Sequence, residues 1–327
     1  MKLGIIGTGT IVTEFLPHLK TIDKLSINAI LSTPRSLPKA KEMAEQYDIP
    51  FVTDDYEAFA KADIDTVYVA VPNHLHYSYS LKALENGLNV IAEKPITSSL
   101  KEVRDLQKTA QEKGLFLFEA ISTLYLEGYQ KIREWLPEIG EIKIAQSQYS
   151  QYSRRYDAFR QGEILPAFDP NKSGGALMDL NLYNIFYILG LFGKPVSQKY
   201  FANMERGIDT SGILVLQYPD FQALCVAAKD SRGMRQGMIQ GTKGIISSYG
   251  SANVGGKIVL DLNDGTTREF ESDPSVNRVV YEFREFIRAI EEDDKDFCYC
   301  MLETSIAVSE VMTSARKDAG IVFAADE

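Results

Sequence analysis

The sequence contains few of the residues that build disulfide frameworks and metal sites. Only 3 cysteines and 3 histidines occur among its 327 residues. Three cysteines cannot form a disulfide framework, and Cys298 and Cys300 are spaced too closely for a C-x-x-C zinc or redox pair. His74 and His76 have no carboxylate or cysteine set at ligand spacing beside them. We therefore expect free thiols, a cytoplasmic location and no metal site.

The chain also lacks an excess of positive charge and a long uncharged apolar run. Its formal net charge is −10, with 35 Lys and Arg against 45 Asp and Glu. This balance argues against a nucleic-acid partner, because nucleic-acid binding calls for a basic face. No stretch of about 18 apolar residues is free of charge, so we expect no membrane span. The first residues already resemble a strand, and the sequence predicts no signal peptide.

Two hydrophobic patterns divide the chain near residues 120–123. Before that point, short apolar runs alternate with helical segments, as in a parallel sheet covered by helices on both faces. After it, polar and apolar residues alternate, as in an antiparallel sheet with one buried face. The sequence thus predicts an α/β fold. It has a doubly wound parallel sheet in residues 1–121 and an open, mostly antiparallel sheet in residues 122–327.

The predicted strands and helices follow these two patterns. In the first part, the strands are Leu3–Ile6, Ile27–Leu31, a weak Phe51–Val52, Val67–Val71, Asn89–Ala92 and Leu115–Phe118. In the second part, they are Ile142–Tyr152, Ile213–Tyr218, Ala223–Ala228 and a hairpin of Lys257–Leu262 with Thr267–Glu271. The predicted helices are Pro38–Tyr47, Tyr77–Asn86, Leu100–Lys113, Ala176–Leu189, Arg278–Glu291 and Glu303–Asp318.

Residues that could bind a cofactor or take part in catalysis lie where the predicted parallel strands end. In such a sheet, ligands bind beyond the carboxyl ends of the strands. The first strand runs into Gly7-Thr8-Gly9-Thr10-Ile11, and a Gly-x-Gly turn lets the backbone approach a pyrophosphate at a helix N-terminus. Later strands end at Val71-Pro72-Asn73, at Glu93-Lys94-Pro95 and at Glu119. We predict a dinucleotide site at this edge. The alternative for the glycines is a tight turn without a ligand.

The end of the second predicted strand indicates which dinucleotide is bound. NAD sites usually carry an Asp or Glu there for the ribose 2′-hydroxyl. This chain has Ser32-Thr33-Pro34-Arg35, and its first carboxylate after this strand is Glu42. Hydroxyls followed by a guanidinium suit a 2′-phosphate, so the sequence favours NADP over NAD, unless Arg35 only faces solvent. His74 and His76 are expected to cap the next helix or to line the cofactor cleft.

Three residues are the candidates for catalysis. Lys94 follows an apolar strand, where it could hold a substrate oxygen and the nicotinamide ribose, although an ion pair with Glu93 is the alternative. Asp179 and Tyr183 lie four residues apart after Gly174-Gly175, so they share one helix face. A carboxylate in such an apolar helix is costly without a partner, which favours a shared polar site over a core tyrosine.

With these motifs in view, the chain resembles the Gfo/Idh/MocA oxidoreductases over nearly its whole length. The resemblance rests on the G-T-G turn, on V-P-N-H-L-H at residues 71–76, on A-E-K-P at 92–95 and on G-G-A-L-M-D-L-N-L-Y at 174–183. The branch that looks most similar is the dihydrodiol dehydrogenase group, through Gly114–Ile121 and Leu216–Pro219.

This resemblance implies an NAD(P)-binding Rossmann domain in residues 1–121 and a substrate-binding and dimerisation domain in residues 122–327. It implies hydride transfer between NADP or NAD and a secondary alcohol or carbonyl of a sugar, cyclitol or diol, in a homodimer or higher homo-oligomer. Tyr183 would exchange the hydroxyl proton, and Asp179 would orient the substrate hydroxyl and Lys94. Because free tyrosine has a pKa of about 10, a cation such as Lys94 should lower it.

The chain departs from the family pattern at four positions. Asn181 stands where the family usually has Gly, and Val12 stands where the nucleotide fingerprint prefers a small residue. Ser122 and Leu124 occupy places that hold Trp and Arg in mammalian-type dihydrodiol dehydrogenases. Without that aromatic ring and that cation, a sugar or cyclitol is a better candidate substrate than an aromatic dihydrodiol.

A function of another class is compatible with the same fold. A nucleotide-sensing regulator could bind NAD(P) and a partner protein without catalysis. The intact set of Lys94, Asp179 and Tyr183 argues against a pure sensor, which has no need of residues for hydride transfer. The sequence therefore favours the enzyme.

Overall fold

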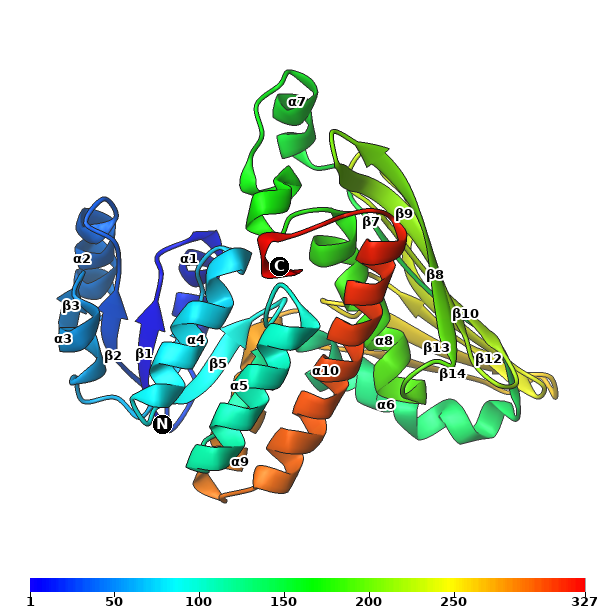
Figure 1. Ribbon diagram of the computed structural model, residues 1–327. Coiled ribbons are helices and arrows are strands. Elements are labelled where there is room, and N and C mark those ends of the chain that lie inside the picture. The colour runs from blue at the N-terminus through cyan, green and yellow to red at the C-terminus, as the bar shows by residue number, and fades with distance from the viewer. Residues whose placement is uncertain (327) are drawn as a thin grey trace. The chain divides into compact units, whose positions relative to one another are not determined.

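The computed structural model describes residues 1–326, which form two compact units (Figure 1). The first unit comprises Met1–Ala120 together with Val279–Glu303. The second comprises Ile121–Arg278 together with the residues from Thr304 onward. Each unit is built around one sheet of its own.

The first unit contains a six-stranded parallel sheet with the strand order β3-β2-β1-β4-β5-β6. Its strands are β1 (Lys2–Ile6), β2 (Ser26–Leu31), β3 (Phe51–Thr53), β4 (Thr66–Val69), β5 (Asn89–Glu93) and β6 (Leu117–Ala120). All residues of β4 and β6 are buried, which explains why the strand sequences are almost continuously apolar. This order is that of the doubly wound fold, so the predicted fold class is confirmed.

Helices cover this sheet, and local signals set their ends. They are α1 (Thr10–Leu19), α2 (Leu37–Gln46), α3 (Tyr56–Ala60), α4 (His76–Glu85), α5 (Leu100–Lys113), α9 (Arg278–Glu291) and the start of α10 (Lys295–Asp318). Ser99 and Glu102 form a capping box at the start of α5, and Gly114 ends it at a φ of 64°. In Figure 1, α4 and α5 lie in front of the strands of this sheet.

The helix α9 belongs to the first unit, although the sequence division assigned residues 122–327 to a second domain. Phe286 stacks on Phe118 of β6 with ring centroids 4.6 Å apart, and Phe283 meets Tyr68 of β4 edge-on at 5.4 Å. Because periodicity shows that a helix has an apolar face but not which sheet that face covers, the sequence could not assign α9.

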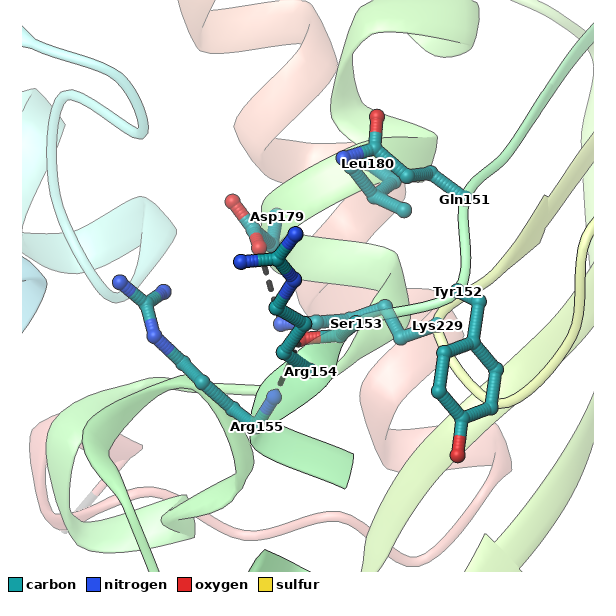
Figure 2. A pocket seen from close by; sticks show the side chains of 8 residues that line it. All are labelled: Gln151, Tyr152, Ser153, Arg154, Arg155, Asp179, Leu180 and Lys229. Carbon is teal, nitrogen blue, oxygen red and sulfur yellow. Dashed lines mark hydrogen bonds and ion pairs between the residues drawn. The ribbon is translucent and has the colours of Figure 1, made fainter. Parts of the chain in front are cut away.

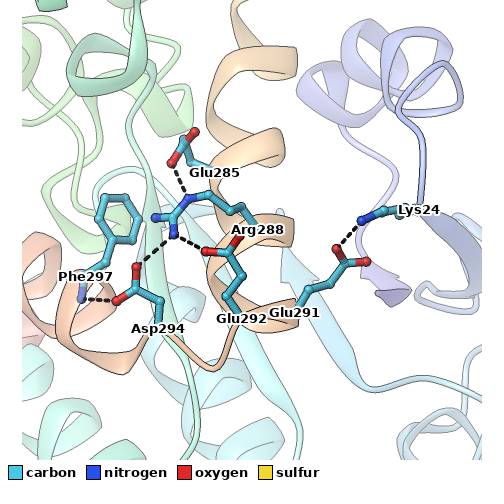
Figure 3. Close-up of polar contacts among 7 residues, drawn as sticks. All are labelled: Lys24, Glu285, Arg288, Glu291, Glu292, Asp294 and Phe297. Atoms are coloured by element: carbon cyan, nitrogen blue, oxygen red, sulfur yellow. Dashed lines mark hydrogen bonds and ion pairs between the residues drawn. The ribbon is translucent and has the colours of Figure 1, made fainter.

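Ion pairs hold the C-terminal end of α9 and the turn that follows it, as Figure 3 shows. Lys24 Nζ lies 2.7 Å from Glu291 Oε2, which joins α9 to the loop before β2. Arg288 pairs with Glu285, Glu292 and Asp294 at 2.8–3.0 Å, and these carboxylates raise its pKa. The Arg288 cluster stabilises the turn between α9 and α10.

The second unit contains an eight-stranded sheet with the order β14-β13-β12-β11-β7-β10-β9-β8. Its strands are β7 (Ile142–Ser150), β8 (Ser197–Glu205), β9 (Ile208–Gln217), β10 (Gln222–Ala228), β11 (Arg235–Gly241), β12 (Gly244–Tyr249), β13 (Lys257–Leu262) and β14 (Thr267–Glu271). All neighbouring strands are antiparallel except β7 and β10. The predicted open, mostly antiparallel sheet is therefore confirmed.

The helices of the second unit are α6 (Glu127–Trp135), α7 (Arg154–Arg160), α8 (Leu182–Phe192) and the rest of α10. One described segment, Pro170–Phe192, is long and apolar enough to cross a membrane by length and composition, and 72% of its most apolar window is buried inside the protein. It contains α8, which packs against β7 and β10. Its apolar composition therefore matches that of a core helix.

Candidate functional site

The predicted Gly-x-Gly turn lies between β1 and α1. Gly7 has a φ of 113°, and a Cβ atom there would lie 2.3 Å from the carbonyl oxygen of Ala70. This position therefore requires glycine. Gly9 is the N-cap of α1, and a Cβ atom there would meet no heavy atom within 4 Å. Packing therefore does not explain Gly9, and the predicted approach of a pyrophosphate to this helix N-terminus stays a prediction.

The loop that should select the cofactor adjoins this turn. The Gly7 amide donates to the carbonyl oxygen of Leu31 at 2.9 Å, so Ser32–Arg35 begins beside the glycines. Arg35 is exposed and forms no ion pair with any of residues 1–326. Lys39 of α2 donates to the carbonyl oxygen of Thr8 at 2.6 Å. Sequence reasoning did not single out Lys39, which places a second cation at these loops.

His76 joins the loops that follow β4 and β5. Its ring is buried, with Nδ1 2.7 Å from the carbonyl oxygen of Pro95 and Nε2 2.8 Å from that of Val71. Burial lowers the pKa of His76, although the two carbonyl contacts oppose this. The sequence predicts that His76 caps the next helix or lines the cofactor cleft. In the structure, its side chain links two loops and does not cap the helix. The neighbouring Lys94–Pro95 peptide bond is cis.

Two buried carboxylates hold the E-K-P motif after β5. The Glu93 side chain accepts hydrogen bonds from the Tyr68 hydroxyl of β4 and, at 3.2 Å, from the Lys94 amide. Glu119 of β6 accepts a hydrogen bond from the Ile96 amide at 3.0 Å. Both carboxylates therefore position the loop that carries Lys94, which is itself partly exposed.

The predicted cofactor residues of the first unit thus lie on adjoining loops at one sheet edge. The Ala70 amide donates to the carbonyl oxygen of Ile6 at 2.9 Å, which places the loop after β4 beside the glycine turn. His76 and Glu119 connect the loops after β4, β5 and β6. Which of these residues touches a cofactor stays a prediction.

The second half of the predicted site starts at the G-G motif of residues 174–183. Gly175 has a φ of 106°, and a Cβ atom there would lie 2.1 Å from Asp209 Oδ1. Asp209 Oδ2 accepts hydrogen bonds from the Leu177 amide and the Tyr200 hydroxyl, each at 2.7 Å. Burial raises the pKa of Asp209. This buried carboxyl group fixes the start of the helix and explains the second glycine.

Asp179 and Tyr183 lie on either side of a change in helix type. Leu177–Asn181 forms a π-helical turn, and α8 continues from Leu182. Such turns are frequent at functional sites. The sequence predicted an α-helix here, so its four-residue spacing does not describe the local geometry. Tyr183 is buried, and its ring centroid lies 6.0 Å from that of Tyr149.

Asn181, which departs from the family pattern, takes part in a buried polar network. Its amide nitrogen donates to the carbonyl oxygen of Cys225 at 3.3 Å, and its amide oxygen accepts a hydrogen bond from Asn184 at 2.9 Å. Asn184 also accepts a hydrogen bond from Ser147 at 2.8 Å. The network ties the helix to β7 and β10, so a side chain at position 181 has a structural role.

Lys229 is a site residue that sequence reasoning missed. Its side chain is 2% exposed, and Nζ donates to Asp179 Oδ2 and to the carbonyl oxygen of Ala167, each at 2.8 Å. Nζ also lies 4.7 Å from the ring centroid of Phe168. A buried ammonium group is strongly disfavoured without a counter-charge, which Asp179 provides. The predicted need of Asp179 for a partner is thus met by a residue 50 positions away.

Asp179 and Lys229 line a pocket within the second unit, shown in Figure 2. The pocket has a volume of about 550 Å³ and is also lined by Gln151–Arg155 and Leu180. Polar and charged side chains therefore dominate its wall. Lys94 belongs to the first unit, whereas Asp179 and Tyr183 belong to the second. The predicted catalytic set combines residues of both units and stays a prediction.

Comparisons with known proteins support both halves of the chain. Residues 1–121 match the model of the GFO/IDH/MocA oxidoreductase family with an NAD-binding Rossmann fold, and residues 129–247 match the GFO/IDH/MocA C-terminal domain. A solved 3-ketoreductase from Actinomadura kijaniata, KijD10 with NADP and TDP-benzene, superposes with a TM-score of 0.84. The alignment covers 97% of both chains at 22% identity, which shows a shared fold.

Several relatives match over the whole length. The scyllo-inositol 2-dehydrogenase (NADP(+)) IolU of Bacillus subtilis is 32% identical over 100% of this chain and 99% of its own. The uncharacterized oxidoreductase YgjR of Escherichia coli is 30% identical over 100% and 98%. The mouse trans-1,2-dihydrobenzene-1,2-diol dehydrogenase is 26% identical over 100% and 99%. These matches confirm the resemblance, and the chain belongs to the GFO/IDH/MocA family of oxidoreductases.

Proposed function

We propose that this protein transfers a hydride between NADP and a secondary alcohol or carbonyl of a sugar-like or cyclitol-like substrate. The observation that carries the proposal is the arrangement of the loops that follow the strands of the first unit. There, an N-cap glycine with open space around it adjoins a loop that has an arginine and no carboxylate. A relative that is 32% identical over the whole chain is named as an NADP(+)-dependent scyllo-inositol dehydrogenase, which supports both the cofactor and the substrate class.

In this proposal, the backbone of Gly7–Ile11 binds the pyrophosphate, because no side chain at Gly9 blocks its approach. Ser32–Arg35 binds the 2′-phosphate, and Lys39 adds positive charge at the same loops. NAD would lack the phosphate that Arg35 recognises and should bind less tightly. The remaining proposed cofactor residues are Val71, Pro72, Asn73, His76, Glu93, Lys94 and Glu119.

The chemistry combines a cofactor with three side chains. The nicotinamide, when bound, supplies the hydride donor or acceptor. Tyr183 exchanges the proton of the substrate hydroxyl, and general acid–base catalysis of this kind contributes about 10²–10⁴-fold. Asp179 orients that hydroxyl, and the hydrogen bond from Lys229 holds the Asp179 carboxylate in position. Lys94 binds the substrate oxygen and favours the ionised form of the tyrosine.

We extend the proposal to a cytoplasmic homo-oligomer that associates through the outer face of the eight-stranded sheet. Phe201 of β8 and Ile213 of β9 lie directly opposite each other on this face and are 59% and 43% exposed. Their strand neighbours Tyr200 and Leu214 are buried on the other face. Adjacent exposed apolar side chains of this kind suit a protein–protein contact.

The test is a binding and turnover assay on the purified full chain. We expect NADPH to bind more tightly than NADH in a fluorescence titration. We also expect a scyllo-inositol, sugar or diol panel to reduce NADP, as followed by nicotinamide absorbance. Nucleotide binding without turnover of any carbonyl or alcohol would favour the sensor, and no binding of either nucleotide would exclude both functions.

A further inference from the structure

The pocket of the second unit carries more positive charge than its own carboxylate balances. Its lining includes Arg154, Arg155 and Lys229 against the single carboxylate Asp179, so three positive charges face one negative charge. The Asp179 carboxylate already receives the Lys229 ammonium at 2.8 Å. Two arginine charges are left over, in a chain whose net charge is −10.

Two carboxylates on or in contact with the helix that carries these arginines have other partners. Asp157 on the same helix accepts a hydrogen bond from the Tyr152 hydroxyl at 2.6 Å, and Glu205 accepts one from Tyr156 at 2.9 Å. Neither Arg154 nor Arg155 forms an ion pair with any of residues 1–326.

Some other arginines pair with acidic side chains, whereas exposed arginines such as Arg35 and Arg160 pair with none among residues 1–326. Arg288 pairs with three carboxylates, and Arg316 forms a two-pronged pair with Asp326 at 2.6 and 2.9 Å. Arg268 pairs with Glu138. Arg154 and Arg155 are adjacent, have no carboxylate partner in the described part of the chain and line a pocket, and this combination fits an anionic ligand.

One pocket brings both arginines together with Asp179. In Figure 2, the Arg154 side chain extends toward Asp179, the Arg155 side chain extends to the left of it, and the Tyr152 ring points to the opposite side. Both arginines and Asp179 line the same 550 Å³ cavity, which has room for a sugar-sized molecule. Guanidinium groups bind carboxylate and phosphate with paired, charge-assisted hydrogen bonds.

We propose that Arg154 and Arg155 bind an anionic group, a carboxylate or a phosphate, on the polyol substrate. This inference rests on the proposed function and specifies its substrate class as acidic or phosphorylated sugars or cyclitols. In this proposal, Asp179 meets the reacting hydroxyl, and the arginines meet the anionic substituent of a ligand bound in the same pocket. Lys229 contributes by neutralising Asp179, which would otherwise repel the ligand.

The experiment compares matched pairs of neutral and anionic substrates on the full chain. The pairs are glucose with glucuronate and myo-inositol with an inositol monophosphate, which separate carboxylate from phosphate recognition. The variants are Arg154→Gln, Arg155→Gln and the double substitution. Arg160→Gln is the control, since this exposed arginine lies on the same helix outside the pocket lining. The readout is the ratio of kcat/KM for the anionic to the neutral member of each pair.

We expect this ratio to exceed 1 in at least one pair for the wild type. It should fall about tenfold for each single arginine substitution and about a hundredfold for the double variant, mainly through KM. Arg160→Gln should leave it unchanged. A wild-type ratio at or below 1 in both pairs would overturn the inference. An unchanged ratio in the double variant, or a loss confined to NADPH affinity, would do the same.

A binding measurement keeps this inference separate from the proposed function. Inositol monophosphate is titrated into the protein by calorimetry without NADP, at low and high salt. Saturable binding that weakens in the double arginine variant and with salt supports the pocket assignment even if no substrate turns over. Turnover of neutral polyols without binding of inositol monophosphate or glucuronate would contradict the proposed anion site and leave the proposed function intact.

Discussion

In the first unit, the candidate site residues lie at or just beyond the ends of strands of one parallel sheet, whereas in the second they come from a helix, a strand end and a loop. The glycine turn and the E-K-P motif end neighbouring strands, so one rule of sheet topology brings them together. Asp179 and Lys229 meet because a helix packs on a mixed sheet, and no comparable rule predicts that pair. Motifs therefore revealed the first half more fully than the second.

The carboxylates of the two halves also differ in their partners. Glu93 and Glu119 accept hydrogen bonds from a tyrosine hydroxyl and from backbone amides. Asp179 pairs with a lysine whose side chain is almost fully buried. A pair of opposite buried charges is much more sensitive to the loss of one partner than a carboxylate with neutral donors. Substitutions in the second half should therefore have the larger effects.

The largest effect is expected for Tyr183→Phe in the second unit. Loss of the hydroxyl should lower kcat by about 10²–10⁴-fold, because proton exchange with the substrate is lost. NADPH affinity should stay at the wild-type level, since the proposed cofactor residues lie in the first unit. Steady-state kinetics and a fluorescence titration measure the two quantities. A variant with wild-type kcat would show that Tyr183 is not the acid–base group.

Lys229→Met should reduce stability most strongly. Breaking a buried ion pair while one charge stays costs about 3–5 kcal/mol. Because the Asp179 side chain is 36% exposed, we expect a value near the lower limit, about 3 kcal/mol. Urea denaturation measures it.

The double variant Lys229→Met with Asp179→Asn should recover part of this loss. Lys199→Met is the matched control, because its pair with Asp318 at 3.3 Å is exposed and should contribute under ~1 kcal/mol. Equal destabilisation by Lys229→Met and Lys199→Met would contradict the buried-pair interpretation.

A smaller effect is expected in the first unit for Arg35→Ala. Removing the guanidinium should weaken NADPH binding about tenfold, the size of one charge-assisted hydrogen bond, and should leave NADH binding nearly unchanged. Lys41→Ala on α2 is the control, since this lysine is exposed on the helix that follows the cofactor loop. An equal loss of affinity for NADPH and NADH would show that Arg35 does not recognise the 2′-phosphate.

The smallest effect concerns the pH dependence of stability through His76. Burial lowers the pKa of His76 in the folded protein, so below about pH 6.5 the unfolded chain takes up a proton that the folded state resists. Stability should therefore fall as the pH falls from 7 toward 5. Thermal unfolding at several pH values should show a flatter profile for His76→Gln than for the wild type. Identical slopes for His76→Gln and the wild type would contradict this account.

Much of the fold was predictable because its signals are local. The predicted helix Leu100–Lys113 and the predicted strands Lys257–Leu262 and Thr267–Glu271 have the bounds that the structure shows. The strand predicted at Leu115–Phe118 is observed two residues later, as Leu117–Ala120. The strand β8 was not predicted, because most of its residues are exposed on this edge of the sheet and give no clear alternation.

The sequence by itself determined the two sheets, the glycine turn and the E-K-P and G-G motifs, because hydrophobic periodicity and turn chemistry act over a few residues. Only the tertiary structure decided that α9 covers the parallel sheet and that Lys229 meets Asp179. It also decided that two arginines line a pocket without carboxylate partners of their own. These outcomes depend on which apolar faces are buried together, and side chains distant in the sequence become neighbours only after that burial.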